Sequence, residues 1–191
     1  MPVTYCGRIP YREPSLEELR ESRIYHITVK EDEKGRPIEL VICTVKPAVY
    51  GEPDRYSLDI YADYKWEESG EEEYTVDILS ADVDWATCDD CPLEGGFTDE
   101  KWLRKLGPLH GAKIRRVDYL GAFESTEITI YASFSYTERM MGLGLTHPVG
   151  MRRMGCYEFH ASVDSDGDER YLEFEVSEAD PDKCYKPAQL L

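Results

Sequence analysis

Carboxylates gather at two places in the sequence where a turn is expected. One group is Glu67, Glu68, Glu71, Glu72 and Glu73, and the other is Asp164, Asp166 and Asp168. Closely spaced carboxylates attract cations, so both groups would steer a basic surface toward the chain. Three aromatic residues precede the first group, and such side chains supply much of the binding energy at protein interfaces: Tyr61, Tyr64 and Trp66. These residues form the predicted partner-binding surface, against the alternative of an acidic surface that serves solubility alone.

Basic residues form two islands against this acidic background. The first lies within residues 101–116 and contains Arg115 and Arg116, while the second is the glycine-rich loop 139–155 with His147, Arg152 and Arg153. Guanidinium groups suit phosphate and carboxylate ligands, and long loops without secondary structure are often functional. The five residues are therefore the predicted anion-binding alternative. The competing interpretation is that these cations only pair with acidic neighbours.

Cys88 and Cys91 are the only close pair among six cysteines. A zinc site would need two further ligands, for which the chain offers Cys156, Cys184, His110 and His147. A four-cysteine ribbon has a second close pair, which this sequence lacks. We therefore expect no cofactor, with zinc at Cys88 and Cys91 as the alternative. Six cysteines are too sparse for a disulfide scaffold, so we expect reduced, mostly buried thiols in a cytoplasmic protein.

Motifs for covalent or nucleotide chemistry are absent from the sequence. It contains no G-x-S-x-G, Walker or dinucleotide glycine pattern. His160 lies two residues after Glu158, so a carboxylate–imidazole pair could form on one strand face. A lone histidine on a solvent-facing strand is usually only a polar residue. The motifs favour a role without catalysis.

The charge balance limits the partners. Lys and Arg number 22 against 39 Asp and Glu, which gives a formal net charge of −17. Such a surface repels phosphate backbones and disfavours non-specific nucleic-acid binding. Residues 1–14 contain no apolar signal segment, and no apolar run reaches the roughly 20 residues of a membrane-spanning helix. These features predict a soluble protein with no membrane partner.

Strands are the elements that would position these residues. Residues 56–66 and 126–137 alternate apolar with polar side chains, which is typical of antiparallel sheets with one packed face. Charged turns that contain glycine link three pairs of runs into hairpins: 23–30 with 38–46, 55–66 with 73–86, and 156–163 with 170–177. A further strand at 113–123 is expected to pair with 126–137. Within 73–86 the apolar positions change phase after Ile78, which predicts a β-bulge or sharp bend.

Two short helices complete the predicted elements. Ser15 and Glu18 have capping-box spacing at the start of residues 15–22. The second helix covers 98–106 and ends before Gly107 and Pro108. The 191 residues favour one domain. We therefore predict a single, mostly antiparallel β domain of about eight strands, either a barrel or a sandwich, over residues 1–191.

The resulting functional hypothesis is an acidic β scaffold that docks on the basic surface of a macromolecular partner. Inhibitors, immunity-type proteins and nucleic-acid mimics use such a surface. The alternative is a β-barrel small-molecule binder or enzyme that holds an anionic ligand at loop 139–155. The 14 tyrosines and three tryptophans could also line an interface, so a homo-oligomer is left open.

Overall fold

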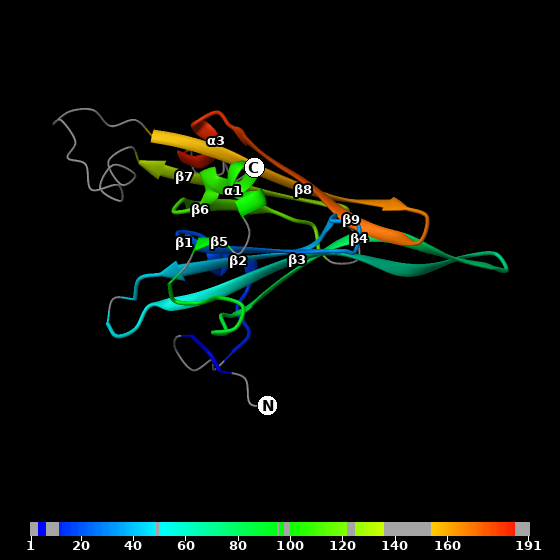
Figure 1. The fold of residues 1–191 in the computed structure, drawn as a ribbon, viewed down its shortest axis with the longest axis horizontal. Coiled ribbons are helices and arrows are strands. Elements are labelled where there is room, and N and C mark those ends of the chain that lie inside the picture. Colours follow the sequence, from blue (N-terminus) through cyan, green and yellow to red (C-terminus); the bar gives the residue numbers. More distant parts are fainter. Residues whose placement is uncertain are drawn as a thin grey trace, which may run out of the picture.

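The computed structural model describes residues 4–6, 12–48, 50–94, 96–97, 100–121, 125–135 and 154–185. It confirms the predicted class, a mostly antiparallel β fold with short helices (Figure 1). The strands are β1 (Arg23–Glu31), β2 (Pro37–Lys46), β3 (Asp54–Ser69), β4 (Glu72–Trp85), β5 (Gly96–Phe97), β6 (Lys113–Asp118), β7 (Glu127–Ser135), β8 (Met154–Asp166) and β9 (Glu169–Glu178).

The helical elements are all short. They are the 3-10 helices η1 (Leu16–Leu19) and η2 (Gly107–Leu109) and the α-helices α1 (Glu100–Leu106) and α3 (Asp182–Tyr185). The helix predicted at 15–22 is a single 3-10 turn, and the Ser15 side chain caps nothing, so the capping box is wrong. The helix predicted at 98–106 corresponds to α1 and continues into η2. No described helix is long and apolar enough to span a membrane.

One continuous sheet has the strand order β4-β3-β2-β1-β6-β7-β8-β9, with β5 parallel to β1. The β1–β6 ladder consists of one residue pair, Arg23 with Lys113. On either side of this join, β1–β4 and β6–β9 form two half-sheets that face one another (Figure 1). β9 lies against β2 and β3, and β4 lies against β7 and β8. In the described residues β4 and β9 do not pair, so the sheet is not closed.

The core lies between the half-sheets. It takes fully buried side chains from both halves, including Leu58, Ile60, Ile130 and Phe159. Helix α1 adds Trp102, whose ring packs at 5.2 Å from that of Phe174. The burial of this apolar surface is the main force that keeps the two half-sheets together.

The register of β3 with β4 overturns one sequence prediction. Pairing runs without interruption from Tyr56 with Trp85 to Ser69 with Glu72, so the predicted bulge or bend within 73–86 is wrong. Residues 78–81 are instead buried on both faces of the strand, so the apolar phase changes while the register does not. The outer edge of β4 is also covered, because the Tyr119 hydroxyl donates to the Leu79 carbonyl at 3.0 Å.

All six cysteines form disulfides, which join Cys6 to Cys88, Cys43 to Cys91, and Cys156 to Cys184. The predictions of reduced thiols and of a cytoplasmic location are therefore wrong, because disulfides persist in oxidising compartments outside the cytoplasm. Sequence spacing could not reveal these pairs. The partners lie 82, 48 and 28 residues apart, and the close pair Cys88 and Cys91 is divided between two bridges.

The Cys156–Cys184 bridge anchors α3 to β8, and its removal should weaken the fold measurably. Replacing both residues by serine should lower the free energy of unfolding by about 3 kcal/mol, because the bridge restricts the unfolded chain. Urea titration of the wild type and the double variant without reductant measures the difference. An unchanged unfolding midpoint would contradict the prediction, as would an intact wild-type mass equal to that of the fully reduced chain.

Candidate functional site

β3 and β4 continue beyond the two half-sheets as a two-stranded projection, which we call the acidic arm (residues 64–77). Figure 1 shows its tip well outside the body. The last pair is Ser69 with Glu72, which leaves a two-residue turn of Gly70 and Glu71. Gly70 adopts a φ of +68°, a conformation that favours glycine at this position of a tight hairpin. The predicted pairing of residues 55–66 with 73–86 is therefore present. The strands extend farther than predicted, however, so that the turn consists of residues 70–71 and not of residues 67–72.

Tyr64 and Trp66 lie on the arm face that continues the core face of β3. Alternate residues of a strand share a face, so both follow Leu58 and Ile60, which are fully buried nearer the body. On the arm the opposite half-sheet covers this face only in part, through Arg170 of β9 against the Tyr64 ring, and Tyr64 is 45% and Trp66 65% exposed. Their rings meet edge to face at 6.2 Å. The arm therefore presents an aromatic pair to solvent.

Tyr61 does not join this pair, because it lies on the other face of β3. Its hydroxyl donates to Asp82 at 2.8 Å, which raises the pKa of Tyr61 to about 12. Tyr74 also lies on that face and donates to Glu67 at 3.0 Å. The structure thus brings together two of the three aromatic residues that the sequence grouped.

The carboxylates of the arm are mostly unneutralised. Glu67 pairs with Lys65 at 3.0 Å, and hydrogen bonds from Lys65 and Tyr74 lower the pKa of Glu67. The other four glutamates are exposed and form no ion pair with a described residue: Glu68, Glu71, Glu72 and Glu73. Glu68 and Glu73 occupy directly opposed positions on the face that carries Trp66. Opposed like charges destabilise a strand pair, so this arrangement does not serve the fold.

Arg170 of β9 fixes the root of the arm. It donates to Asp77 at 2.5 Å and to Thr75 at 3.2 Å, and its guanidinium group lies 4.4 Å from the centre of the Tyr64 ring. These contacts hold β4 against the opposite half-sheet. The arm beyond Trp66 consists only of the two paired strands.

The second predicted acidic group lies at the β8–β9 turn, near the root of the arm, and is partly neutralised. Asp164 accepts a hydrogen bond from Tyr171 at 3.2 Å, and Asp166 lies 3.6 Å from Arg36. Glu169 beside them accepts from both Arg36 and Lys34 of the β1–β2 turn. Asp168 is exposed and contributes its backbone carbonyl to Arg170. This turn therefore offers less uncompensated charge than the arm does.

A carboxylate pair that the sequence analysis missed lies on the outer face of the sheet. Asp59 is half-buried, and its Oδ1 atom has no hydrogen-bond partner among the described residues. Burial, followed by a hydrogen bond and repulsion from Glu39, raises the pKa of Asp59 to about 7. Asp82 raises it further and Lys30 opposes the shift. Alternation placed Asp59 on a polar face, but its proximity to Glu39 depends on the register of β2 with β3.

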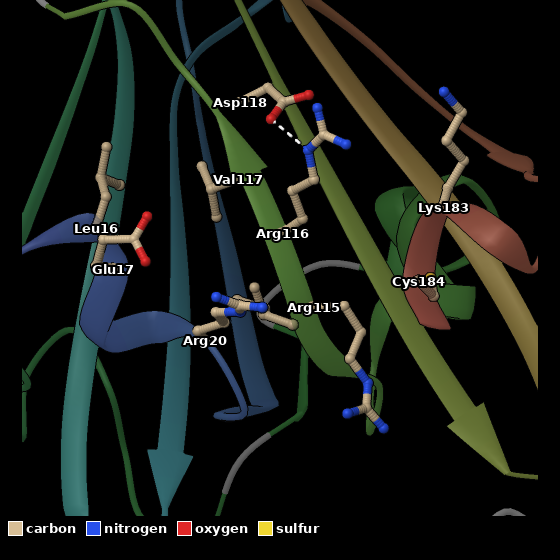
Figure 2. A pocket seen from close by; sticks show the side chains of 10 residues that line it. Leu16, Glu17, Arg20, Arg115, Arg116, Val117, Asp118, Lys183 and Cys184 are labelled. Atoms are coloured by element: carbon tan, nitrogen blue, oxygen red, sulfur yellow. Dashed lines mark hydrogen bonds and ion pairs between the residues drawn. The ribbon is translucent and has the colours of Figure 1, made fainter. Parts of the chain in front are cut away.

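The predicted anion-binding arginines line a cleft of about 220 Å³ between η1, β6 and α3 (Figure 2). Arg115 donates to both carboxylate oxygens of Glu21 at 2.9 Å and to Ser133 at 2.7 Å. Arg116 donates to Asp118 at 2.7 Å. Both guanidinium groups thus have acidic partners within the chain, as the competing interpretation expected. His147, Arg152, Arg153 and loop residues 139–153 lie outside the described residues.

Cys88 and Cys91 do not offer the free thiolates that the zinc alternative requires. Both sulfurs are bonded to other cysteines, and the described residues contain no group of three or more metal-ligating side chains. His160 lies 3.0 Å from Glu127 instead of pairing with Glu158. Glu158 accepts a hydrogen bond from Tyr131 at 3.2 Å.

The chain matches no protein-family model, no curated protein and no solved structure. The candidate site is therefore argued from the geometry of this chain alone.

The raised pKa of Asp59 predicts a pH-dependent stability. Between its ordinary pKa of 3.8 and about 7, the folded protein holds a proton that the unfolded chain releases, so the free energy of unfolding falls as pH rises through this range. Asp59→Asn removes this titration and should flatten the fall between about pH 5 and about pH 8. At about pH 8 the Asp59→Asn variant should also be more stable than the wild type. Urea unfolding at both pH values measures the effect, and the exposed Asp89→Asn provides the control. Equal pH dependence in the two variants would refute the assignment.

Trp66 also allows the electrostatic environment of the arm to be measured directly. Trp85 and Trp102 are each only 8% exposed, so collisional quenching of tryptophan fluorescence reports mainly on Trp66. Because carboxylates concentrate cations around them and repel anions, the ratio of caesium to iodide quenching should be higher for Trp66 than for free N-acetyltryptophanamide under the same conditions. Glu68→Gln with Glu73→Gln should lower this ratio, whereas Glu33→Gln with Glu52→Gln should preserve it. A ratio no higher than that of the free compound would show that the surroundings of Trp66 are not negative.

Proposed function

We propose that the protein is a non-enzymatic interaction protein whose acidic arm docks on a basic surface of a macromolecular partner. One observation carries the proposal: Trp66 is exposed on the same arm face as the opposed pair Glu68 and Glu73, beyond the body of the protein. A basic docking site can complement this face, because its surface can cover the Trp66 ring and its cationic side chains can pair with the two glutamates.

The energetics of the isolated arm support this proposal. The solvent-exposed ring of Trp66 leaves apolar area unburied, and burial of such area contributes roughly 25 cal/mol per Å². The opposed glutamates destabilise the strand pair by an amount on the order of 0.2–1 kcal/mol. A partner that covers the aromatic pair and places lysine or arginine near the glutamates would remove both penalties. The arm would thus be more stable in the complex than alone.

The same carboxylates would also attract a basic partner before the two proteins are in contact. Carboxylates at the end of a projecting hairpin steer a basic partner over about one Debye length, roughly 8–10 Å at physiological salt. A row of carboxylates can also occupy a site built for nucleic-acid phosphates. Nucleic-acid-binding proteins and enzymes with basic clefts therefore have the required partner chemistry, and an inhibitory or immunity-type role follows if the arm occupies such a cleft.

Binding of a defined basic probe tests the role of the arm. We expect the immobilised protein to bind a lysine- and arginine-rich peptide of about 20 residues, with an association rate that falls about tenfold from 50 to 500 mM NaCl. Replacing the five arm glutamates by glutamine should slow association by about tenfold as well. Trp66→Ala should mainly accelerate dissociation, because it removes a contact and no charge.

A variant with the same charge change elsewhere is the matched control. Five exposed glutamates outside the arm, none of them ion-paired with a described residue, can be replaced by glutamine: Glu13, Glu33, Glu52, Glu94 and Glu178. This variant should keep most of the association rate. If it loses as much as the arm variant, total charge governs binding and the proposed role of the arm is wrong.

A further inference from the structure

The two border strands of the sheet, β4 and β9, differ in what lies beside them. On β4, the Leu79 N–H donates to the Ser125 carbonyl at 3.0 Å, and the Tyr119 hydroxyl donates to the Leu79 carbonyl. Beside β9, no residue that the structure describes bonds to the outer backbone (Figure 1). We propose that β9 binds an extended basic segment of a partner protein as an additional strand. This surface excludes the acidic arm, and the inference does not rest on the function proposed for the arm.

The hydrogen bonds at the end of β9 show which of its backbone groups face outward. The Ala179 N–H donates to the Cys156 carbonyl at 2.9 Å, and these two residues flank the opposed pair Tyr157 and Glu178. In an antiparallel ladder, such a flanking bond marks a pair that exchanges no hydrogen bonds of its own. The register of β8 with β9 contains no bulge, so the alternation continues along the strand. Three inner residues therefore point their N–H and C=O groups away from β8: Leu172, Phe174 and Val176.

Open space borders these backbone groups. A groove of about 660 Å³ lies along β9, with residues 171–175 on one side. The β1–β2 turn and α1 form the other wall, to which they contribute Arg36, Lys101 and Trp102. α1 contacts β9 through side chains, as in the ring contact of Trp102 with Phe174, and no described residue of α1 bonds to the β9 backbone. An incoming strand therefore finds both backbone partners and room.

The charges of β9 argue against a second copy of this chain as the occupant. Glu173 and Glu175 are exposed and form no ion pair with a described residue. If two copies paired antiparallel about Phe174, Glu173 of one copy would lie opposite Glu175 of the other. Opposed like charges destabilise a strand pair, and natural edge strands use charges against self-association. A strand with lysine or arginine at these positions would be attracted instead.

The two faces of β9 define the sequence pattern of the segment. Side chains that lie opposite one another in adjacent strands share a face of the sheet. Residues opposite Glu173 and Glu175 would therefore be basic. Residues opposite Phe174 would face α1, where Lys105 Nζ already lies 5.0 Å from the centre of the Phe174 ring, so an apolar side chain fits better than a further cation. The surface thus favours alternating basic and apolar residues, recognised by strand addition.

Titration of the ¹⁵N-labelled full chain with the peptide acetyl-Lys-Val-Lys-Val-Lys-Val-Lys-amide tests the surface at individual sites. We expect saturable shifts of the Leu172, Phe174 and Val176 amide signals at up to about 1 mM peptide. Acetyl-Lys-Lys-Lys-Lys-Val-Val-Val-amide has the same charge and composition without the alternation, and it should bind at least about tenfold more weakly.

Matched variants test the role of the two glutamates. Glu173→Gln with Glu175→Gln should weaken binding of the alternating peptide by about tenfold, because it removes the charges that the lysines face. Glu33→Gln with Glu52→Gln makes the same charge change at exposed positions outside β9 and should leave the affinity unchanged. Equal weakening in both double variants would show that total charge governs binding, which would overturn the proposal.

Methylation of the peptide backbone separates strand addition from attraction between charges. Only every second residue of an added strand donates its N–H to β9. N-methylation of the valines should abolish binding if the segment is antiparallel to β9, and N-methylation of the lysines should do so if it is parallel. In each case the other methylated peptide should still bind. Equal effects of the two modifications would overturn the proposal, because both peptides carry the same charge.

Hydrogen exchange of the free protein supplies a second measurement. The amides of Phe174 and Val176 should exchange at least about tenfold faster than those of Glu173 and Glu175, which face β8, and the alternating peptide should slow them. Equally slow exchange without peptide would show that the outer backbone is already covered and would overturn the proposal. Shifts of these amides with protein concentration alone would assign the edge to a second copy, with the same consequence. Peptide-induced shifts confined to the acidic arm would support the function of the arm and refute this inference.

Discussion

The β1–β6 ladder that joins the two half-sheets has one residue pair, Arg23 with Lys113, and backbone hydrogen bonds between residues 21–24 and 111–114 flank it. Because this join is short, the fold also depends on contacts that hold the halves together elsewhere. The shared core supplies most of this stabilisation. At the periphery, Tyr119 covers the edge of β4, and Arg170 ties β9 to Asp77. The disulfides then limit the unfolded chain. The short central join is thus supplemented by contacts that fasten the outer strands across the core.

The ion pairs that hold the outer strands in place also determine which carboxylates remain without a cationic partner. Arg36 and Lys34 neutralise Glu169 at the β8–β9 turn, and Arg170 neutralises Asp77 at the root of the arm. The glutamates of the acidic arm lie past these cations, and among them only Glu67 has a cationic partner in the described residues, the neighbouring Lys65. Charge on the arm is thus a part of the acidic excess that folding does not use. The contacts that stabilise the sheet leave four neighbouring arm glutamates without a cationic partner.

Local patterns predicted the strands and hairpins, and non-local pairing explains what the sequence could not predict. Alternation identified the faces of β3, including the common face of Tyr64 and Trp66, and the acidic arm was foreseeable because its residues are neighbours in sequence. Cys88 and Cys91 resembled metal ligands because they are close together in the sequence. Their bridging partners, Cys6 and Cys43, are distant in the sequence and gave no local signal. The Asp59–Glu39 pair and the cleft between η1, β6 and α3 each combine residues of separate elements. Such sites need the register and the tertiary fold.

The length of β3 and β4 extends a folding pattern into the surface that we propose for docking. The alternation that buries Leu58 and Ile60 continues to Tyr64 and Trp66, where the opposite half-sheet covers the face only in part, through Arg170. An exposed hairpin with an aromatic face invites edge-to-edge pairing with a second copy, and natural sheets oppose this with charged edges. Two arms placed together would bring their glutamates into repulsion, whereas a basic surface would be attracted by them. The charge pattern therefore disfavours self-association through the arm, and the proposed docking needs a partner of opposite charge.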